Sequence, residues 1–348
     1  MVRRVTLVVP DTLWPYRQAH PSSFRNDLKL TALKKFKARS KVKTVDPREF
    51  HRRLFELFNI PVADQDDLPL AAVIRSIDSV AAPDCYYMFA DPVHLRADRD
   101  SIVMMGNADL DIDEKESDGL LHIINTHLST DGIHILPMSG HQHWCLSVPR
   151  PQKLHTYPLD QVVGRKIQDY MPYGEHGGYW RNALNEIQML LNVSEINRKR
   201  EQKGELAINS VWFWGGGVLP PMGDVSWTSV SGNDDVLRGL ASLGGLDCEP
   251  LAADAESWLE TAGPGEHLVV FDDARKSMHQ ADVEAWRNFM MALDTLWLAP
   301  LLELLKTNRL TDLTIYLDSN HCLQITPRLA RHWWRDILSH KIEIKNTD

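Results

Sequence analysis

Cysteine is scarce in this chain of 348 residues, and the few that occur follow no disulfide or metal-binding pattern. The four cysteines, Cys85, Cys145, Cys248 and Cys322, are scattered, and no CxxC pair is present. Disulfide-stabilised domains and zinc ribbons both need closely spaced cysteines, so the sequence excludes these classes. We expect reduced thiols that are mostly packed inside the protein.

Long uninterrupted apolar runs are also missing. The most apolar stretch, residues 297–305, is broken by Pro300 and Glu303, and the N-terminus shows no charged segment followed by an apolar one. A membrane-spanning helix needs about 20 apolar residues, and a secretory signal needs the second pattern. The sequence therefore predicts a soluble, cytoplasmic protein with no membrane partner. Its length favours roughly two domains.

Positive charge is in deficit, because the formal net charge is -9 at pH 7. Nucleic-acid binding usually needs a basic surface, so a nucleic-acid partner is not favoured. Residues 29–43 are the exception, with seven Lys or Arg in fifteen positions. A solvated helical face is the preferred interpretation, because few aromatic residues are interleaved for base stacking. A nucleic-acid regulator that uses this segment remains a third functional class.

Short β-branched and apolar runs recur along the chain, with helical patterns between several of them. The expected strands are residues 5–9, 101–105, 133–136, 211–214, 268–271 and 313–317. Continuous apolar runs of this kind are typical of strands buried on both faces. The alternation with helices predicts an α/β fold with a largely parallel sheet.

Three segments have helical periodicity. In residues 179–191 the apolar side chains recur every three or four positions and form one stripe. A second helix is expected over residues 281–306, kinked or divided at Pro300, and a short third one over residues 330–338. Between residues 103 and 177 the sequence becomes acidic and rich in turn residues. We interpret residues 103–177 as an inserted module, with residues 1–102 and 178–348 forming the core.

The segment "INSVWFWGGGVLPP", residues 208–221, joins an aromatic strand to Gly215, Gly216 and Gly217. Ligands of parallel α/β sheets bind beyond the carboxyl ends of strands, and glycine lets a backbone amide approach a ligand. A tight structural turn and a ligand-approaching turn both agree with the pattern. It is neither GxGxxG nor a P-loop.

Upstream of this segment, amide side chains share one edge of the expected helix over residues 179–191. They are Asn185, Gln188 and Asn192, and Arg198 and Arg200 follow in a turn-rich stretch. The two arginines allow an anion clamp or a solvated charged turn.

Taken together, "WRNALNEIQMLL", "IN..R...G", "INS", "WFWGGG" and "HQHWCLSV" resemble motifs of a known family. They resemble the archaeal-type, cofactor-independent phosphoglycerate mutases of the alkaline phosphatase superfamily. They look closer still to a bacterial branch whose members are labelled RpfE-type regulatory proteins or phosphoglycerate mutase homologues. The resemblance implies an alkaline-phosphatase-like α/β core, a largely parallel sheet and an inserted smaller α+β module.

The resemblance also implies a site that holds two divalent metal ions, Mn or Zn, around a Ser or Thr nucleophile. The residues that match its metal ligands are Asp11, Asp273, His279, Asp318 and His321. Two departures stand out. The family's Asp-x-x-x-His and Asp-His spacings are longer here, and "DLPLAA", residues 67–72, contains no hydroxyl where the nucleophile should be. Thr12 is the hydroxyl nearest to a candidate ligand.

Substrate contacts follow from the same resemblance. Arg96, in "ADPVHLRAD", matches the region of a ligand-facing arginine, although a surface salt bridge explains it equally well. The other candidate substrate-binding residues are Asn185, Arg198, Gly215 and Gly216. His141 and His143, in "GHQHW", are better explained by packing or substrate contact than by metal binding, because no third ligand can be assigned.

These observations lead to two main functional hypotheses. The first is a phosphoglycerate-mutase-like protein with an eroded nucleophile and metal site, which binds a small phosphorylated molecule as a non-catalytic or regulatory protein. The alternative is an active divalent-metal-dependent phosphoglycerate mutase or phosphomonoesterase that uses Thr12. The sequence does not identify a regulatory partner.

Overall fold

A computed structural model describes residues 3–12, 28–45, 49–63, 66–78, 82, 84–138, 143–318 and 321–336. The chain forms two compact units, each with its own sheet. The first unit combines both ends of the chain, Met1–Asn59 and Gly223–Asp348, and the second is Ile60–Met222.

The second unit is longer than the predicted insert of residues 103–177. Strand β3 (Tyr86–Asp98) precedes that insert and strand β7 (Ser210–Val218) follows it, yet the two strands pair with each other in one antiparallel sheet. This pairing places both strands in the second unit, whose limits therefore lie at residues 59/60 and 222/223.

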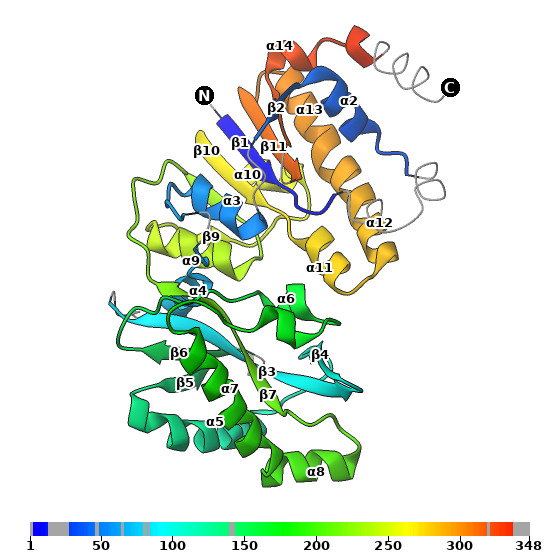
Figure 1. The fold of residues 1–348 in the computed structure, drawn as a ribbon. Coiled ribbons are helices and arrows are strands. Elements are labelled where there is room, and N and C mark those ends of the chain that lie inside the picture. Colours follow the sequence, from blue (N-terminus) through cyan, green and yellow to red (C-terminus); the bar gives the residue numbers. More distant parts are fainter. Residues whose placement is uncertain are drawn as a thin grey trace. The chain divides into compact units, whose positions relative to one another are not determined.

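The first unit contains a seven-stranded sheet in the order β2-β12-β11-β1-β10-β8-β9. Its strands are β1 (Arg3–Val8), β2 (Lys41–Thr44), β8 (Ser229–Ser231), β9 (Cys248–Glu249), β10 (Gly265–Val270), β11 (Asp312–Asp318) and β12 (His321–Ile325). The five strands β11, β1, β10, β8 and β9 run parallel, and β12 and β2 are antiparallel additions at one edge. Figure 1 shows β1, in blue, between β10 and β11. The predicted α/β fold with a mostly parallel sheet is confirmed.

Helices surround this sheet because its central strands are apolar on both faces. They are α2 (Thr31–Arg39), α3 (Phe50–Leu57), α9 (Asp235–Leu243), α10 (Ala255–Thr261), α11 (Asp273–His279), α12 (Val283–Ala292), α13 (Ala299–Lys306) and α14 (Pro327–Ala330). Val5 and Leu7 of β1, Val269 of β10 and Ile315 of β11 are buried in one core with α2, α10, α12 and α13. The expected helix over residues 330–338 extends beyond the described residues.

Helices α12 and α13 are joined by a π-helical segment, η3 (Leu293–Leu298), so the helix stays continuous where the sequence predicts a kink at Pro300. Pro300 lies in the first turn of α13, where its missing N–H costs little. Among the described residues this stretch, Val283–Lys306, is long and apolar enough to cross a membrane. Trp286, Leu293 and Trp297 lie buried in the core of the first unit, however, so packing accounts for its apolar face.

The basic segment of residues 29–43 divides into α2 and the edge strand β2. Helix α2 buries Ala32, Leu33 and Phe36, and the main-chain N–H groups of Ala32 and Leu33 are capped by Asp294 at 3.0 and 2.6 Å. The lysines of β2 are exposed at the edge of the sheet, where charge discourages pairing with another chain. This arrangement agrees with a solvated helical face.

The second unit is built on an antiparallel sheet of five strands. In addition to β3 and β7, it contains β4 (Ser101–Gly106), β5 (His134–Pro137) and β6 (Trp144–Val148). Its helices are α4 (Leu70–Asp78), α5 (Glu114–Leu128), α6 (Leu159–Val162), α7 (Gly177–Asn192) and α8 (Glu195–Lys203), with short 3-10 turns η1 (Ser129–Asp131) and η2 (Ile167–Tyr170).

The sheet of the second unit has two distinct faces. Tyr86, Met88 and Ala90 of β3 pack in one core with α5 and α7, whereas Val93 and Leu95 belong to a second cluster with α6 and η2. Helix α4 contacts β3 and β7. Because side chains alternate along a strand, Phe89, Asp91 and Val93 share one face of the sheet. This face therefore carries a charged side chain, that of Asp91.

Candidate functional site

The carboxyl ends of three neighbouring parallel strands in the first unit carry aspartates. Asp11 follows β1, Asp272 and Asp273 follow β10, and Asp318 is the last residue of β11. Parallel strands end at the same edge of a sheet, so the topology brings these main-chain positions together. Asp318 and His321 are direct cross-strand partners in the hairpin of β11 and β12. The side chains of His279, Asp318 and His321 lie outside the described part of the structure.

Asp272 is the buried carboxylate of this edge, although the sequence pattern favours its neighbour Asp273. Its Oδ2 atom accepts a hydrogen bond of 2.7 Å from the Lys276 ammonium, one helical turn further on. Its Oδ1 atom is buried and has no partner among the described residues. Asp273 is half-buried, and its pKa is raised by burial first and then by the charge of Asp272. One of these two carboxylates is thus already compensated by a cation of the protein.

Asp11 and Thr12 both contribute to the structure of the turn after β1. Asp11 has a left-handed backbone (φ 58°), and its carbonyl accepts a hydrogen bond of 3.1 Å from the Trp286 indole. The Thr12 hydroxyl is buried and donates to the Leu317 carbonyl at 2.9 Å. The candidate nucleophile is therefore held by the main chain of β11.

A second buried carboxylate, Asp234, caps helix α9. It accepts hydrogen bonds from the Leu237 amide at 2.9 Å and from His51 Nε2 at 3.2 Å. Burial would raise the pKa of Asp234, but His51, the Leu237 amide and the charge of Arg275 outweigh it and hold the pKa below its usual range. The Arg275 guanidinium also lies over the Phe50 ring, with its Cζ atom 5.4 Å from the ring centroid. Asp234, like Asp272, thus has positive charge beside it.

Across the described ranges, no three His, Cys, Asp or Glu side chains come together as a group that could hold a metal ion. The ammonium of Lys276 lies against Asp272, where a divalent cation would be repelled. The described residues alone therefore do not fit the expected site for two ions.

The hydroxyl-free segment, residues 67–72, leads into α4 and is fixed by its own contacts. The Asp67 carboxylate accepts bonds from the Thr156 amide at 2.8 Å and from its hydroxyl at 2.5 Å. Burial raises the pKa of Asp67, and the bonds from Thr156 oppose this rise. Leu70, Ala71 and Ala72 are buried. The segment expected to carry the nucleophile is part of the packing of the second unit.

Gly215, Gly216 and Gly217 lie inside strand β7, which corrects the expectation of a turn after residue 214. The strand continues to Val218, and its pairing with β3 shifts register between Trp214 and Gly217. A Cβ atom on Gly216 would overlap the Tyr86 hydroxyl, and one on Gly217 would overlap Pro69. The glycines therefore allow a tyrosine and the start of α4 to pack closely against the strand. Gly215 alone has a left-handed backbone, with φ 64°.

The motif around Arg198 is mainly structural. Arg198 is exposed and pairs with Glu195 on the same helix at 2.7 Å. Arg200 is instead buried, and its guanidinium contacts Glu116 and the carbonyls of Leu110 and Leu206. Asn197 accepts a bond from the Ile208 amide at 2.8 Å and donates to the Leu191 and Ile208 carbonyls. Residues 197 and 200 thus tie α8 to the start of β7.

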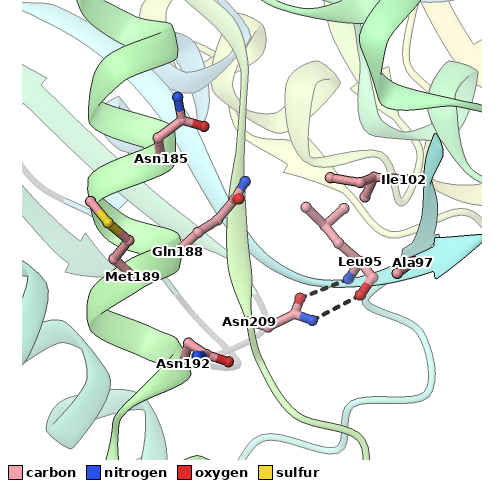
Figure 2. Close-up of a pocket in the computed structure, with 8 residues that line it drawn as sticks. All are labelled: Leu95, Ala97, Ile102, Asn185, Gln188, Met189, Asn192 and Asn209. Atoms are coloured by element: carbon pink, nitrogen blue, oxygen red, sulfur yellow. Dashed lines mark hydrogen bonds between the residues drawn. The ribbon is translucent and has the colours of Figure 1, made fainter. Parts of the chain in front are cut away.

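Asn185 lines a groove of about 420 Å³ in the second unit, shown in Figure 2. Asn185, Gln188, Met189 and Asn192 project from α7, and Leu95, Ala97, Ile102 and Asn209 complete the lining. The Asn209 side chain imitates the pairing of a strand with β3. Its Oδ1 atom accepts from the Leu95 amide at 2.7 Å, and its Nδ2 atom donates to the Leu95 carbonyl at 2.8 Å. All eight lining residues are uncharged. The groove therefore suits a neutral polar group better than a phosphate.

Arg96 is exposed on β3, between Leu95 and Ala97, and does not line this groove. Its main chain is the partner of Val103 in β4. The side chains of β3 alternate in direction, which explains why its two neighbours line the groove. Its role as a ligand-facing arginine stays a prediction.

Sequence reasoning did not find Asp91, the most deeply buried carboxylate of the second unit's sheet. Its side chain is 0% exposed, and it accepts bonds from His143 Nδ1 at 3.0 Å and from the Trp214 indole at 2.8 Å. For His143 the sequence predicts packing or substrate contact, and the other histidine of that motif, His141, lies outside the described residues. The signal was a charged residue in the middle of an apolar run, "YYMFADPV".

Comparison with known proteins supports the resemblance, although no family model matches the chain. The chain is 23% identical over 216 residues to the 2,3-bisphosphoglycerate-independent phosphoglycerate mutase of Methanosarcina mazei, covering 55% of this chain and 53% of that enzyme. It is 28% identical over 162 residues to a probable enzyme of the same name from Geobacter sulfurreducens, covering 44% of this chain and 40% of the relative. The match thus spans about half or less of the length of these curated relatives.

A solved structure shares the fold. The PH0037 protein from Pyrococcus horikoshii matches with a TM-score of 0.58 at 11% identity, over 93% of this chain and 87% of that protein. A cofactor-independent phosphoglycerate mutase from Thermoplasma acidophilum matches with a TM-score of 0.48 at 14% identity, over 92% and 89% of the two chains. The homologues found by sequence are cofactor-independent phosphoglycerate mutases, as the motifs predict.

Proposed function

We propose that this chain is a phosphoglycerate-mutase-like protein of the regulatory type, which binds a small phosphorylated molecule in the cytoplasm and does not transfer its phosphoryl group. Sequence similarity to phosphoglycerate mutases supports the ligand class. The observation that carries the proposal is the ion pair between Asp272 and Lys276 at the carboxyl end of β10.

Lys276 stands four residues after Asp272, which is the spacing at which the resemblance implies a histidine. An imidazole in that position could bind a metal ion together with the carboxylate. The lysine ammonium instead bonds to the carboxylate at 2.7 Å and supplies positive charge of its own. A lysine in this place makes metal binding unfavourable through like-charge repulsion.

The position of the expected nucleophile supports the same proposal. Residues 67–72 contain no hydroxyl, and Asp67 is engaged by Thr156. The nearest alternative, Thr12, donates its proton to a main-chain carbonyl and is buried. Neither arrangement presents a free alkoxide precursor to a ligand.

The test is an assay of the purified full chain with 3-phosphoglycerate and with p-nitrophenyl phosphate, after loading with Mn²⁺ or Zn²⁺. We expect no turnover of either compound, together with saturable binding of 3-phosphoglycerate in calorimetry. Turnover that disappears in an Asp318→Ala variant would contradict the proposal.

A matched pair of variants tests the role of Lys276. Lys276→His restores the expected Asp-x-x-x-His spacing, whereas Lys276→Met removes the ammonium without adding a ligand. We expect Lys276→His to retain more Mn²⁺ after desalting than both the parent protein and Lys276→Met. Equal retention in all three proteins would show that Lys276 does not control metal binding.

The alternative is an active metal-dependent phosphomutase or phosphomonoesterase. It is favoured by the Oδ1 atom of buried Asp272, which has no partner within the described ranges. In that case Asp11, Asp273, His279, Asp318 and His321 would hold two ions, Thr12 would be the nucleophile, and Arg96 and Arg198 would contact the substrate. Two metal ions per chain and activity abolished by Thr12→Val would establish this function. Activity unchanged in Thr12→Val would exclude Thr12 as the nucleophile.

A further inference from the structure

Asp91 lies buried in the middle of β3 without a lysine or arginine bonded to it among the described residues. Phe89 is the cross-strand partner of Cys145, and continuing this register by two residues places His143 opposite Asp91. Its two carboxylate oxygens accept from His143 Nδ1 and from the Trp214 indole. A buried carboxylate is costly unless donors of this kind satisfy it, so Asp91 fixes the orientation of both rings.

His143 is the exposed member of this pair. Its side chain is 51% exposed, whereas that of Asp91 is 0% exposed. Because the carboxylate accepts the Nδ1 proton, the ring is held in one orientation, and a second proton on Nε2 makes it an imidazolium that can donate to an anion. An imidazole positioned in this way is prepared for contact with a ligand, and its orientation does not have to be fixed during binding.

Aromatic side chains form a wall beside His143. The rings of Phe89 and Trp214 stack with their centroids 4.6 Å apart, and the His143 ring lies 6.2 Å from that of Phe89. Gly215 follows Trp214, and its left-handed backbone carries β7 past Phe89, where a Cβ atom would come within 3.1 Å of the ring. Here the glycine has a specific purpose, because it allows the stack that Asp91 anchors.

Arg75 supplies positive charge on the same face of the sheet. It projects from α4, which packs on β3 and β7, and it is partly exposed. Burial raises the pKa of Cys145, and the nearby Arg75 guanidinium opposes this rise while the charge of Asp91 adds to it. Both charged groups therefore lie near Cys145, two residues from His143. Arg75 makes no hydrogen bond or ion pair with the described residues.

Four other arginines of the second unit donate to groups of the protein, whereas the exposed Arg96, Arg99 and Arg150, like Arg75, have no side-chain hydrogen bond or ion pair with the described residues. Arg75 differs from these three because it is partly buried. Arg200 bonds to Glu116, Arg198 to Glu195, Arg181 to the Pro172 carbonyl and Arg165 to Tyr170. A partly buried guanidinium without an anion keeps its five donors available, and its planar fork suits a phosphate or a carboxylate.

We propose that Arg75 and His143 bind the anionic group, phosphate or carboxylate, of a small ligand, with Asp91 as the positioning residue for His143 and Trp214 as the side wall. The proposal rests on the proposed function for the class of ligand, and it adds the residues of the second unit that hold it. These residues lie apart from the uncharged groove along α7.

The test measures binding of 3-phosphoglycerate, inorganic phosphate and glycerate to the full chain by calorimetry. Arg75→Gln and His143→Gln are compared with Arg198→Gln, a surface arginine of the same unit. A charge-assisted hydrogen bond contributes enough that we expect each of the first two changes to raise the Kd of 3-phosphoglycerate at least about tenfold. We expect Arg198→Gln to bind as the parent protein does.

The smaller probes identify the group that is held. If inorganic phosphate competes with 3-phosphoglycerate and glycerate does not, Arg75 and His143 hold the phosphate. The reverse result assigns them to the carboxylate. A parent protein that binds none of the three probes, or unchanged Kd values in both Arg75→Gln and His143→Gln, would overturn the inference.

Two controls separate this inference from the proposed function and from misfolding. Turnover of 3-phosphoglycerate by the parent protein would end the proposal of a non-catalytic role, yet the effects of Arg75→Gln and His143→Gln on Kd would still support the binding site. Arg75→Lys keeps the positive charge and loses the planar, forked guanidinium, so we expect an intermediate Kd in a folded protein.

The role of Asp91 as positioning residue is tested with Asp91→Asn. Long-range proton–nitrogen spectra of the His143 ring should show loss of the Nδ1-protonated form. An unchanged spectrum would remove Asp91 from this role.

Discussion

Each unit holds a buried carboxylate where side chains from several strands meet, and the two units compensate that charge differently. In the first unit, Asp272 has the Lys276 ammonium and Asp234 has His51. In the second unit, Asp91 is held by the rings of His143 and Trp214, while Arg75 has no hydrogen bond or ion pair with the described residues. In the first unit, groups of the protein itself therefore compensate the charges of both carboxylates. In the anion site that we propose for the second unit, Arg75 and the exposed His143 contact the ligand.

The architecture of the two sheets explains where these charges are found. A parallel sheet collects polar residues at its strand ends, which is where Asp11, Asp272 and Asp318 lie. An antiparallel sheet has no common carboxyl edge, so polar residues that meet must lie side by side on one face. Asp91 of β3 and His143, the residue before β6, lie side by side in this way on neighbouring strands.

The largest effect is expected where a buried cation is completely used by the fold. Arg200 is 2% exposed and bonds to Glu116 and to two main-chain carbonyls. Arg200→Ala leaves these groups without partners, and breaking a buried ion pair costs about 3–5 kcal/mol of unfolding free energy. Urea unfolding followed by tryptophan fluorescence measures the change.

The matched control for that prediction is Arg198→Ala. Arg198 belongs to the same helix but forms only an exposed pair with Glu195, and exposed pairs contribute about 0–1 kcal/mol. Similar losses in Arg198→Ala and Arg200→Ala would show that burial does not separate the two arginines.

A somewhat smaller loss is expected from Asp91→Ala, which breaks the anchored face of the second unit. The change removes the acceptor of both the His143 and the Trp214 hydrogen bonds. His143 can turn toward water, whereas the indole donor is partly buried, so we expect a loss of about 2 kcal/mol in unfolding free energy. Asp131→Ala is the control, because Asp131 accepts an exposed bond from Tyr179. An unfolding free energy as high as that of Asp131→Ala would mean that Asp91 does not anchor the rings.

The strands of the first unit could be predicted because burial on both faces leaves a continuous apolar run, as in β1, β10 and β11. Strand β3 could not be predicted, since Asp91 and Pro92 interrupt its middle. Proline lacks the N–H donor of the ladder, and aspartate is depleted in strands. Here distant residues compensate, because His143 and Trp214 satisfy the carboxylate.

The candidate sites show the same limit. The aspartates at the strand ends follow from the topology, and the pairing of Asp272 with Lys276 follows from their spacing of one helical turn. The glycines of β7 resemble a loop because the residues that fill their space, Tyr86 and Pro69, are more than one hundred positions away. Arg75 meets the Asp91 face only through the packing of α4.

In the first unit, removing the internal counter-charge should have a moderate effect. Lys276→Met leaves the buried Asp272 carboxylate without its cation. Because the lysine side chain is 55% exposed, water replaces part of the interaction, and we expect a loss of about 1 kcal/mol at neutral pH. Thermal or urea unfolding measures it, with Lys203→Met, which removes an exposed and longer pair, as the control. No difference between the two variants would mean that Lys276 does not compensate Asp272.

The smallest effect is expected at Asp273, and it has a defined pH dependence. Burial and the charge of Asp272 raise the pKa of Asp273, so the folded protein binds a proton at Asp273 more tightly than the unfolded chain does. The stability that this proton contributes is present below the unfolded pKa of about 3.9 and is lost as pH rises through the folded pKa. At neutral pH the charged carboxylate therefore costs stability.

Asp273→Asn removes this cost, so we expect the variant to be more stable than the parent protein at neutral pH, by less than about 1 kcal/mol because solvent screens a half-exposed group. The difference should shrink as pH falls through the raised pKa of Asp273, because the carboxylate of the parent protein then gains its proton. Urea unfolding across this range measures it in metal-free protein. If Asp273 instead binds a metal ion, Mn²⁺ should stabilise the parent protein and not Asp273→Asn, and the first unit would then share with the second a charge that is kept for a ligand.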